Sequence, residues 1–450
     1  MTLPAACGTI KGKRPRISRI TREEFDYEDQ DPPCNGRGGA CRPAAKAPRP
    51  QAPPIFWRTL IRLLSYFDLR ATNFSYTTER MEEVGKTPCL ILMNHSSFID
   101  MEIASTIFYP RPLSIVCTSD GFVGKAWLMR QIGCIPTQKF VSDITLIRDM
   151  MHALHKKRSS VLMFPEASYS FDGTATPLPR RMGVLLKKLG VPVVTVKTEG
   201  AFLRAPLYNG LQKRRVHVSA HVKCLFTPAE LAAKPVEELD RALDEVFTYD
   251  HFAAQRQNRV PVREPFRADG LERILYRCAA CGAEGKTVGR GISLTCRACG
   301  KQWQMDEYGS LHATEGETHF SHVPAWYAWE RDCVRGELEA GRYRLDVPVR
   351  IGLLTDYRAI YMVGEGRLVH DENGFCLYGA DGALLYSQSP IASYGLYADY
   401  YWYELGDVIC IGNRHALYYC FPPEGVSVAR ARLAAEELYK LRKAAPAGNV

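Results

Sequence analysis

The stretch LMNHSSFID, from Leu92 to Asp100, sets the local architecture of the chain. An apolar run ends in a histidine and two serines, and an aspartate follows five positions after the histidine. Positions five apart lie about 140° from each other around an ideal helix, so His95 and Asp100 cannot meet within one helix. They can meet if His95 lies in the turn after a strand and Asp100 in the first turn of the next helix. The stretch therefore predicts a strand, a turn and a helix that bring together two groups able to move a proton.

The sequence around this stretch repeats the same pattern. Continuous apolar runs, which are typical of strands buried on both faces, alternate with helical patterns such as Ile99 to Ile107. Four of these runs are CLILM (Cys89 to Met93), LSIVC (Leu113 to Cys117), SVLMF (Ser160 to Phe164) and VPVVTV (Val191 to Val196). Such alternation predicts an α/β sheet covered by helices.

The second half of the chain has a different pattern of residue types. From about Tyr343 to Phe421, β-branched and aromatic runs are broken by Gly, Asp and Asn, and a helical pattern runs from Val426 to Lys443. The runs RAIYMV, FCLYG, ALLYS, DVICIG and ALYYCF each read as strands. This half is therefore predicted to be mostly β with a closing helix.

Composition and charge bound the class of protein. The 450 residues are 46% hydrophobic and 24% charged, and the formal net charge is +9. This is the composition of a globular protein, and the basic balance suggests an anionic partner, for which a membrane surface, a nucleic acid and a phosphorylated metabolite all fit. No window approaches the roughly 18 uninterrupted apolar residues of a spanning helix. The N-terminus lacks the pattern of a secretory signal, and fifteen cysteines, an odd number, do not read as a disulfide framework. We expect a cytoplasmic location.

Four segments are expected along the chain. Residues 1–54 read as a disordered basic tail rich in Pro and Gly, 55–255 as the α/β domain, 271–312 as a small cysteine-bearing unit, and 320–445 as the β-rich domain. The α/β domain opens with IFWRTLIRLLSYF, Ile55 to Phe67, which is apolar on most sides and carries two arginines. This stretch fits an interfacial helix that lies on a membrane and a first helix packed on the domain about equally well.

The chemistry of the opening stretch follows from the pairing of its two polar groups. A carboxylate that accepts a hydrogen bond from one imidazole nitrogen leaves the other nitrogen free to act as a base. His95 and Asp100 would then form a base and its orienting partner, without a nucleophile from the protein. The nucleophile has to come from the substrate, most simply as a hydroxyl.

Three further stretches match a family when taken with NHSSFID. They are FPEASYSFDG (Phe164 to Gly173), GCIPTQK (Gly133 to Lys139) and VPVVTV. NHSSFID and FPEASYS resemble the first and third motifs of the glycerophospholipid acyltransferases, a family that includes the lysophosphatidic acid acyltransferases. GCIPTQK and VPVVTV fall where the second and fourth motifs of that family lie. The resemblance covers about Pro54 to Asp250, and four motifs in order are more specific than any one of them.

The resemblance implies an enzyme that moves a fatty acyl group from acyl-CoA or acyl-carrier protein to the hydroxyl of a lysophospholipid, with lysophosphatidic acid the first candidate. His95 would deprotonate the acceptor hydroxyl, and Asp100 would orient and stabilise the imidazole. Substrate binding would involve the residues Phe164, Pro165, Glu166, Ser168 and Lys139. In this group Glu166 would arrange the acceptor and Lys139 would contact its phosphate. The partners implied are a membrane lipid surface, a lysophospholipid and an acyl donor, with the protein attached peripherally.

Two positions depart from the family pattern. The glycine usual after the glutamate of the third motif is Ala167, and the arginine usual two residues further on is Tyr169. The first change narrows the backbone options of the turn, and the second removes an expected phosphate contact. Arg180 and Arg181 could supply the missing charge, or the acceptor is a different lipid. An alternative function is a non-catalytic protein that uses the same fold and the cysteine-bearing unit as a scaffold for lipid or nucleic acid.

Two cysteine pairs form the second strong signal. CAAC (Cys278 to Cys281) is followed after fourteen residues by CRAC (Cys296 to Cys299), and a glycine stands directly after each pair. Four thiolates at this spacing predict a zinc ribbon, with a structural zinc because no ligand position is left for water. Redox dithiols are the competing interpretation, but they usually come as a single pair on a βαβ frame. A basic loop lies between the pairs, yet no aromatic face accompanies it, so no nucleic acid is expected.

The β-rich domain carries no catalytic motif. Its succession of strands before one amphipathic helix looks like a pleckstrin-homology-like barrel, a kind of module that binds lipid headgroups or proteins.

Overall fold

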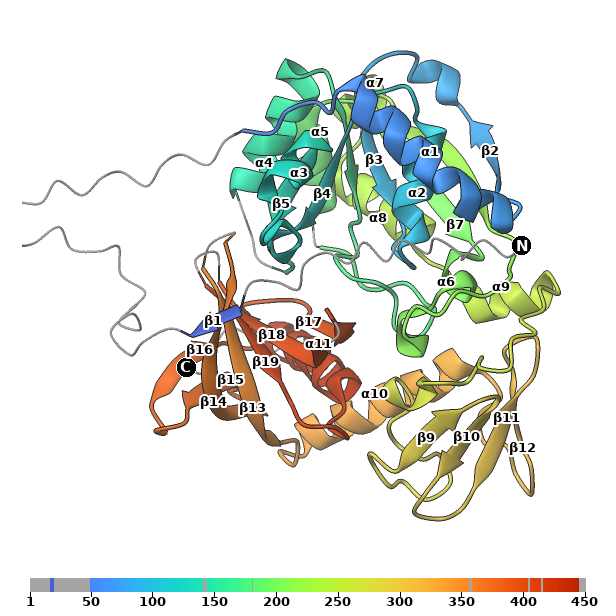
Figure 1. The fold of residues 1–450 in the computed structure, drawn as a ribbon, viewed down its shortest axis with the longest axis vertical. Helices are drawn as coiled ribbons and strands as arrows, with labels where there is room; N and C mark the ends of the chain where they lie inside the picture. Colours follow the sequence, from blue (N-terminus) through green and yellow to red (C-terminus); the bar gives the residue numbers. More distant parts are fainter. Residues whose placement is uncertain are drawn as a thin grey trace, which may run out of the picture.

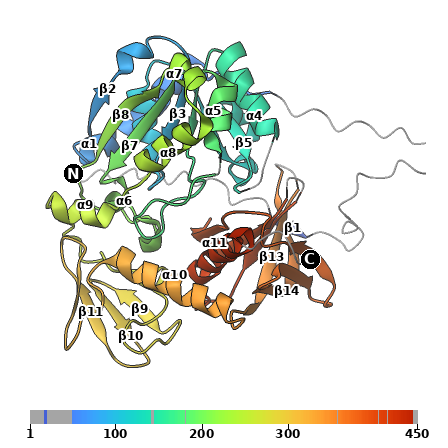
Figure 2. The ribbon, with the colours of Figure 1, turned by 180° about the vertical axis from the view of Figure 1, so that it is seen from behind.

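The computed structural model describes residues 17–19, 49–140, 144–179, 181–355, 358–403, 405–413 and 416–444. They form three β-sheets with helices packed around and between them (Figures 1 and 2). Of the tail predicted to be disordered, only residues 17–19 and 49–54 are described, so that prediction falls mostly outside the described residues.

The first sheet has seven strands in the order β2-β8-β7-β3-β6-β4-β5. All neighbouring strands are parallel except β7 and β8. The strands span Ser75–Glu79 (β2), Leu90–Met93 (β3), Leu113–Thr118 (β4), Cys134–Thr137 (β5), Ser160–Met163 (β6), Val193–Glu199 (β7) and Ser219–Phe226 (β8). The four strands predicted from apolar runs are confirmed as β3, β4, β6 and β7.

Helices cover this sheet on both faces, as the α/β prediction requires (Figure 1). They span Ile55–Ala71 (α1), Ile99–Ile107 (α2), Ala126–Gln131 (α3), Ile144–Met151 (α4), Met182–Leu189 (α5), Ala201–Arg204 (α6), Pro228–Ala233 (α7), Val236–Val246 (α8) and His251–Gln257 (α9). The helix predicted from its isoleucine stripe is α2, with the predicted bounds.

The central strand β3 shows why these strands read as continuous apolar runs. Ile91 and Met93 pack into one core with α2, whereas Leu90 and Leu92 pack into another core with α5 and α8. All four side chains are fully buried. A strand covered on both faces has no position where a polar side chain meets water, so its sequence does not alternate.

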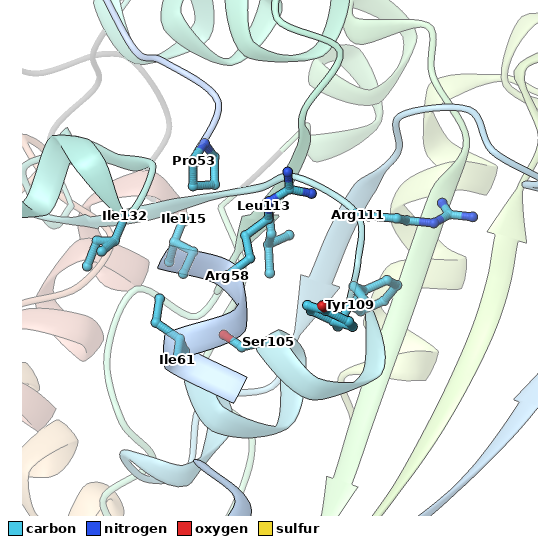
Figure 3. A pocket seen from close by; sticks show the side chains of 10 residues that line it. Pro53, Arg58, Ile61, Ser105, Tyr109, Arg111, Leu113, Ile115 and Ile132 are labelled. Atoms are coloured by element: carbon cyan, nitrogen blue, oxygen red, sulfur yellow. The ribbon is translucent and has the colours of Figure 1, made fainter. Parts of the chain in front are cut away.

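Helix α1 has one face on the domain and one face in solvent. Figure 3 shows Arg58 and Ile61 of α1 lining a small pocket with Ser105 of α2 and with Leu113 and Ile115 of β4. The exposed side of the helix carries the apolar side chains Ile55, Phe56, Leu63, Leu64, Tyr66 and Phe67. The helix is thus packed on the domain, and its outer face still has the character expected of an interfacial helix. No helix among the described residues is long and apolar enough to cross a bilayer.

The second sheet carries the two cysteine pairs. Its four antiparallel strands lie in the order β12-β11-β10-β9 and span Thr287–Arg290 (β9), Ser293–Cys296 (β10), Gln302–Met305 (β11) and Leu311–Ala313 (β12). A helix that the sequence patterns did not predict, α10 (Val323–Glu339), follows it. Trp303 of β11 and Trp326 of α10 are fully buried against each other, with ring centroids 4.9 Å apart.

The third sheet contains most of the C-terminal half. Its strands lie in the order β16-β15-β14-β13-β19-β18-β17, and β1 (Ile17–Arg19) pairs with β14. They span Leu345–Leu354 (β13), Ile360–Asp371 (β14), Gly374–Gly379 (β15), Leu384–Gln388 (β16), Tyr397–Trp402 (β17), Gly406–Gly412 (β18) and Leu417–Phe421 (β19). The closing helix is α11 (Val428–Ala444). The mostly-β prediction with a closing helix is confirmed, whereas the likeness to a pleckstrin-homology barrel stays a prediction.

One hydrophobic core joins the second sheet, α10, α11 and the third sheet. It also includes Phe171 from the loop after β6 and Phe202 of α6. In both views α6 lies at the end of the first sheet that is turned toward the other two sheets (Figures 1 and 2). The predicted domain boundaries at 255, 271, 312 and 320 stay predictions. One core runs across the predicted segments 271–312 and 320–445.

Candidate active site and metal centre

His95 and Asp100 meet at the junction of β3 and α2. His95 Nδ1 lies 3.2 Å from Asp100 Oδ2. The same oxygen accepts hydrogen bonds from the backbone N–H groups of Ser96 (2.7 Å) and Ser97 (3.0 Å). Asp100 is fully buried in the first turn of α2, where the exposed N–H groups of a helix favour a negative charge. The turn and the helix start thus hold the carboxylate against the imidazole.

The imidazole of His95 is held between two aromatic rings. Its centroid lies 3.9 Å from that of Phe164 and 4.1 Å from that of Tyr169. Burial lowers the pKa of His95, while Asp100 acts to raise it and the charge of Lys139 acts to lower it. The net shift is downward, so the imidazole is neutral at neutral pH, as a general base must be. With Nδ1 engaged by Asp100, Nε2 is the nitrogen left for a substrate.

The loop that follows β6 contains a strained turn. Ala167 has φ +59°, in the left-handed region that glycine adopts more readily than alanine. This is the position where the family usually has glycine, so the chain keeps the turn and accepts the strain of a side chain. The backbone N–H of Ser170 donates to the carbonyl of His95 at 2.9 Å, which ties this loop to the first motif.

Glu166 is buried under this loop. Its carboxylate accepts hydrogen bonds from the Thr176 backbone N–H (3.0 Å), the Thr176 hydroxyl (2.9 Å) and the Tyr249 hydroxyl (2.7 Å). Burial raises the pKa of Glu166 to about 7. Sequence reasoning proposed that Glu166 arranges the acceptor; in the structure it braces the loop beside His95 and is not among the described residues that line the pocket. Ser168 is also buried and likewise does not line the pocket.

A large open pocket, with about 900 Å³ of space, lies in front of His95. Phe164, Pro165 and Lys139 line it, as the sequence reasoning proposed. Part of its wall is apolar and comes from the first sheet and its helices, from residues that include Ile115, Ile144, Leu146, Ile147, Met163 and Leu185. Arg181 is exposed and is not among the described lining residues, and Arg180 lies outside the described part of the chain.

The other side of the pocket comes from β17, which sequence reasoning did not connect with the site. Tyr397, Asp399, Tyr400 and Trp402 line the pocket beside Lys139, whose Nζ lies 4.1 Å from the centroid of the Tyr397 ring. The one signal in the sequence was the dense aromatic run YADYYWY from Tyr397 to Tyr403. Such a run is also typical of an ordinary strand, so its place next to His95 could not be read from it.

The four cysteines of the second sheet come together in one cluster. The Sγ atoms of Cys278, Cys281, Cys296 and Cys299 all lie within 4.8 Å of one another. Two pairs, Cys278 with Cys299 and Cys281 with Cys296, are each separated by 3.8 Å. Sulfurs bound at about 2.3 Å to one tetrahedral ion would be roughly 3.8 Å apart, so the cluster fits zinc.

The two glycines after the cysteine pairs make the cluster compact. Gly282 and Gly300 have φ +74° and +75°, a conformation that glycine adopts without strain. Their N–H groups donate to the carbonyls of Cys278 (2.8 Å) and Cys296 (2.9 Å). Each pair therefore forms a tight knuckle whose two thiols point to the same centre.

The segment that carries the site matches a known class of protein. A family model described as Acyltransferase matches residues 68–199, which carry His95, Asp100, Lys139 and Glu166. This segment of the chain is therefore similar to the acyltransferase family.

Within that class, the chain is similar to one named enzyme and to one solved structure. It is 30% identical over 118 residues to the 1-acyl-sn-glycerol-3-phosphate acyltransferase BAT2, chloroplastic, of Brassica napus, a match that covers 25% of this chain and 33% of that protein. The chain thus spans about a third of the length of this relative. The crystal structure of the 1-acyl-sn-glycerophosphate (LPA) acyltransferase PlsC from Thermotoga maritima covers 42% of this chain and 76% of its own, at 18% identity and a TM-score of 0.35.

Proposed function

We propose that this protein transfers a fatty acyl group from a thioester donor, acyl-CoA or acyl-carrier protein, to the hydroxyl of a lysophospholipid. The observation that carries the proposal is the 3.2 Å contact of His95 with Asp100 at a large pocket, within a segment of the acyltransferase family. The name of the Brassica napus relative favours lysophosphatidic acid as the first acceptor to test.

The reaction follows from the geometry of His95. The acceptor hydroxyl gives its proton to His95 Nε2 as its oxygen attacks the thioester carbonyl. Asp100 stabilises the imidazolium that forms, because its carboxylate faces Nδ1. The tetrahedral intermediate then collapses to the ester, and the thiolate leaves and takes the proton from the imidazolium. No residue of the protein carries the acyl group.

The apolar side of the pocket supports this substrate class. Ile115, Leu146, Ile147 and Met163 offer a surface on which an acyl chain can lie, while His95 and Lys139 line the polar part. Burying an alkyl chain on such a surface stabilises binding by about 0.8 kcal/mol for each CH₂ group.

The assay for this function follows thiol release from acyl-CoA with and without a panel of lysophospholipids, and identifies the diacyl product by mass spectrometry. The expected result is thiol release that depends on the acceptor and is lost in His95→Ala. Release that ignores the acceptor would contradict the proposal. So would a covalent acyl group trapped on Cys117, a thiol that lines the pocket, or on the buried Cys89.

We also propose that the protein works at a membrane surface reached through α1. The exposed apolar stripe includes Phe56, Leu64 and Phe67, the last with 76% of its surface exposed, and Arg62 and Arg70 are exposed beside it. Such a helix enters the headgroup region with its apolar face while the arginines attract anionic lipid.

Liposome sedimentation tests the membrane proposal. Leu64→Glu combined with Phe67→Glu should weaken binding several-fold, and more strongly on vesicles with anionic lipid. The matched control is Val184→Glu combined with Leu384→Glu, which changes two apolar side chains that are also exposed but lie on α5 and β16. Equal sedimentation of the two double variants would contradict a role for α1.

For the cysteine cluster we propose one structural zinc. The four thiolates would fill the coordination of the ion, and the ion would hold the two knuckles of the second sheet together. Elemental analysis should find about one zinc per chain, and Cys278→Ser should release it and lower the melting temperature. Cys376→Ser, at a half-buried cysteine of the third sheet, is the control. Protein that is folded, free of zinc and reactive at all four thiols would contradict the proposal.

A further inference from the structure

Strand β17 and the turn after it bring a second set of side chains to the pocket of His95. Six residues of this segment line the pocket: Tyr397, Asp399, Tyr400, Tyr401, Trp402 and Tyr403. They lie about three hundred positions after His95 in the chain and belong to a different sheet. Five are aromatic and one is acidic, so this aromatic wall differs in chemistry from the apolar wall of the first sheet.

Two hydrogen bonds fix the aromatic wall to the first sheet. The Tyr397 hydroxyl (2.8 Å) and the Trp402 indole N–H (3.1 Å) both donate to Asp120 Oδ2. Asp120 lies in the short helical turn Ser119–Phe122 after β4, and all three side chains are buried. A carboxylate that takes two buried donors from the other sheet holds the two walls in register.

The backbone of the aromatic wall is irregular where it faces the pocket. The pairing of β17 with β18 shifts register between Asp399 and Trp402, which marks a bulge. Tyr401 and Tyr403 have φ +52° and +44°, a conformation that costs free energy for residues with side chains. Bulges and strained residues gather at sites where a side chain has to point in a particular direction. The irregular backbone is therefore consistent with side chains that are directed toward a ligand.

Asp399 and Lys139 give this part of the pocket two opposite charges. Asp399 is half-buried, and the backbone N–H of Tyr400 donates to its Oδ1 at 2.9 Å. Burial raises the pKa of Asp399 to about 6, against the effect of the Lys139 charge, so the carboxylate is mostly ionised at neutral pH. The two side chains line the same pocket but do not form a direct ion pair in the described structure. A ligand can therefore reach both.

These charges do not suit a simple phosphate monoester. Such a group carries nearly two negative charges at neutral pH, by analogy with a phosphorylated side chain. At the position where the family usually has an arginine, this chain has Tyr169, whose phenol brings no positive charge. Asp399 would repel the phosphate that Lys139 attracts. A carboxylate beside aromatic faces is instead a good environment for an ammonium group.

We propose that the acceptor is a zwitterionic lysophospholipid, with its phosphate held by Lys139 and its ammonium group held by Asp399 against the aromatic wall. This inference rests on the proposed acyl transfer and specifies its acceptor. It assigns the third sheet a role in acceptor selection, and Asp399 is the residue that determines the headgroup.

The experiment compares four acceptors that share one acyl chain: lysophosphatidylethanolamine, lysophosphatidylcholine, lysophosphatidylglycerol and lysophosphatidic acid. The first two carry an ammonium group, and lysophosphatidylglycerol is a phosphodiester of similar size without one. We expect kcat/KM for the two zwitterionic acceptors to exceed that for the other two by roughly tenfold or more. Asp399→Asn should bring the ratio toward one, mainly through KM, while Glu372→Gln, at an exposed carboxylate on the turn after β14, should leave it unchanged.

The outcomes separate this inference from the proposed function. A wild-type preference for lysophosphatidic acid or lysophosphatidylglycerol overturns the inference and leaves acyl transfer intact, and so does a headgroup ratio that Asp399→Asn does not change. Absence of transfer to all four acceptors overturns the acyl transfer itself and the inference with it. The wild-type ratio is decisive on its own, so the result does not depend on how Asp399→Asn folds.

Discussion

The two walls of the pocket contrast in how their residues are held. On the first wall, which the first sheet and its loops form, His95 and Asp100 lie only five positions apart in the chain, and Thr176 and Tyr249 hold the loop with Glu166 in place. On the aromatic wall, Asp399 lines the pocket from a bulged strand, and two hydrogen bonds to Asp120 tie the wall to the first sheet. The first arrangement suits chemistry, which needs fixed distances. The second suits recognition, because side chains on it can change without disturbing the base.

The largest effect is expected for the base. His95→Ala should lower kcat by roughly 10² to 10⁴-fold, the range expected for loss of general base catalysis, with little change in melting temperature. Asp100→Asn should follow closely, because an amide supports the imidazolium poorly and can stabilise the wrong tautomer. Steady-state kinetics with circular dichroism as a check on folding measures both. Near-normal turnover of His95→Ala would show that His95 is not the general base.

The buried carboxylate of Glu166 should make the stability of the protein depend on pH. Burial raises the pKa of Glu166 to about 7, whereas an unfolded glutamate titrates near 4.3. Between these values the folded state binds the proton more tightly than the unfolded state, so this group makes the protein less stable as pH rises from 5 to 8. Glu166→Gln lacks the titration. The melting temperature of this variant, relative to that of the wild type, should therefore rise as pH rises over the same range. A difference in melting temperature that does not change with pH would contradict the burial of Glu166.

Removing the link between the walls should have a moderate effect. Asp120→Ala leaves the buried Tyr397 hydroxyl and Trp402 indole N–H without their acceptor, at a cost of about 1 to 3 kcal/mol. Asp120→Asn keeps an acceptor oxygen and should cost less. Urea unfolding gives the free energy, and KM for the acceptor should rise more than kcat falls. If Asp120→Ala is as stable as the wild type, the two walls are not held together in this way.

The smallest effect is expected at the strained turn of the first wall. Ala167 holds φ +59°, and the left-handed conformation costs about 1 to 2 kcal/mol for a residue with a side chain. Ala167→Gly should raise the free energy of unfolding by up to about 1 kcal/mol, since glycine gains freedom in the unfolded chain as well. Thermal unfolding at one pH is sufficient. Destabilisation by this change would mean that the alanine methyl group packs usefully where the family has none.

Much of the first wall was predictable because its contacts are local. The strand β3, the helix α2 and the pairing of His95 with Asp100 all follow from eighteen consecutive residues, Leu90 to Ile107, and four motifs in order pointed to the family. The cysteine cluster was predictable for the same reason, since each pair and its glycine form a knuckle within five residues. The buried position of Glu166 was less predictable from the sequence. Its side chain is buried under the loop because Tyr249, eighty-three positions later, donates to it.

The sequence by itself determined the acyltransferase motifs, the α/β order, the cysteine knuckles and the mostly-β C-terminal half. Each of these depends on spacing along the chain, which fixes short-range geometry whatever the rest of the fold does. Only the tertiary structure decided that Asp399 and the aromatic residues of β17 line the same pocket as His95. That pocket joins segments about three hundred residues apart, and it exists because one hydrophobic core draws the third sheet and Phe171 together. No local pattern records such an arrangement, since an aromatic strand has the same sequence pattern whether its outer face meets solvent, a core or a substrate.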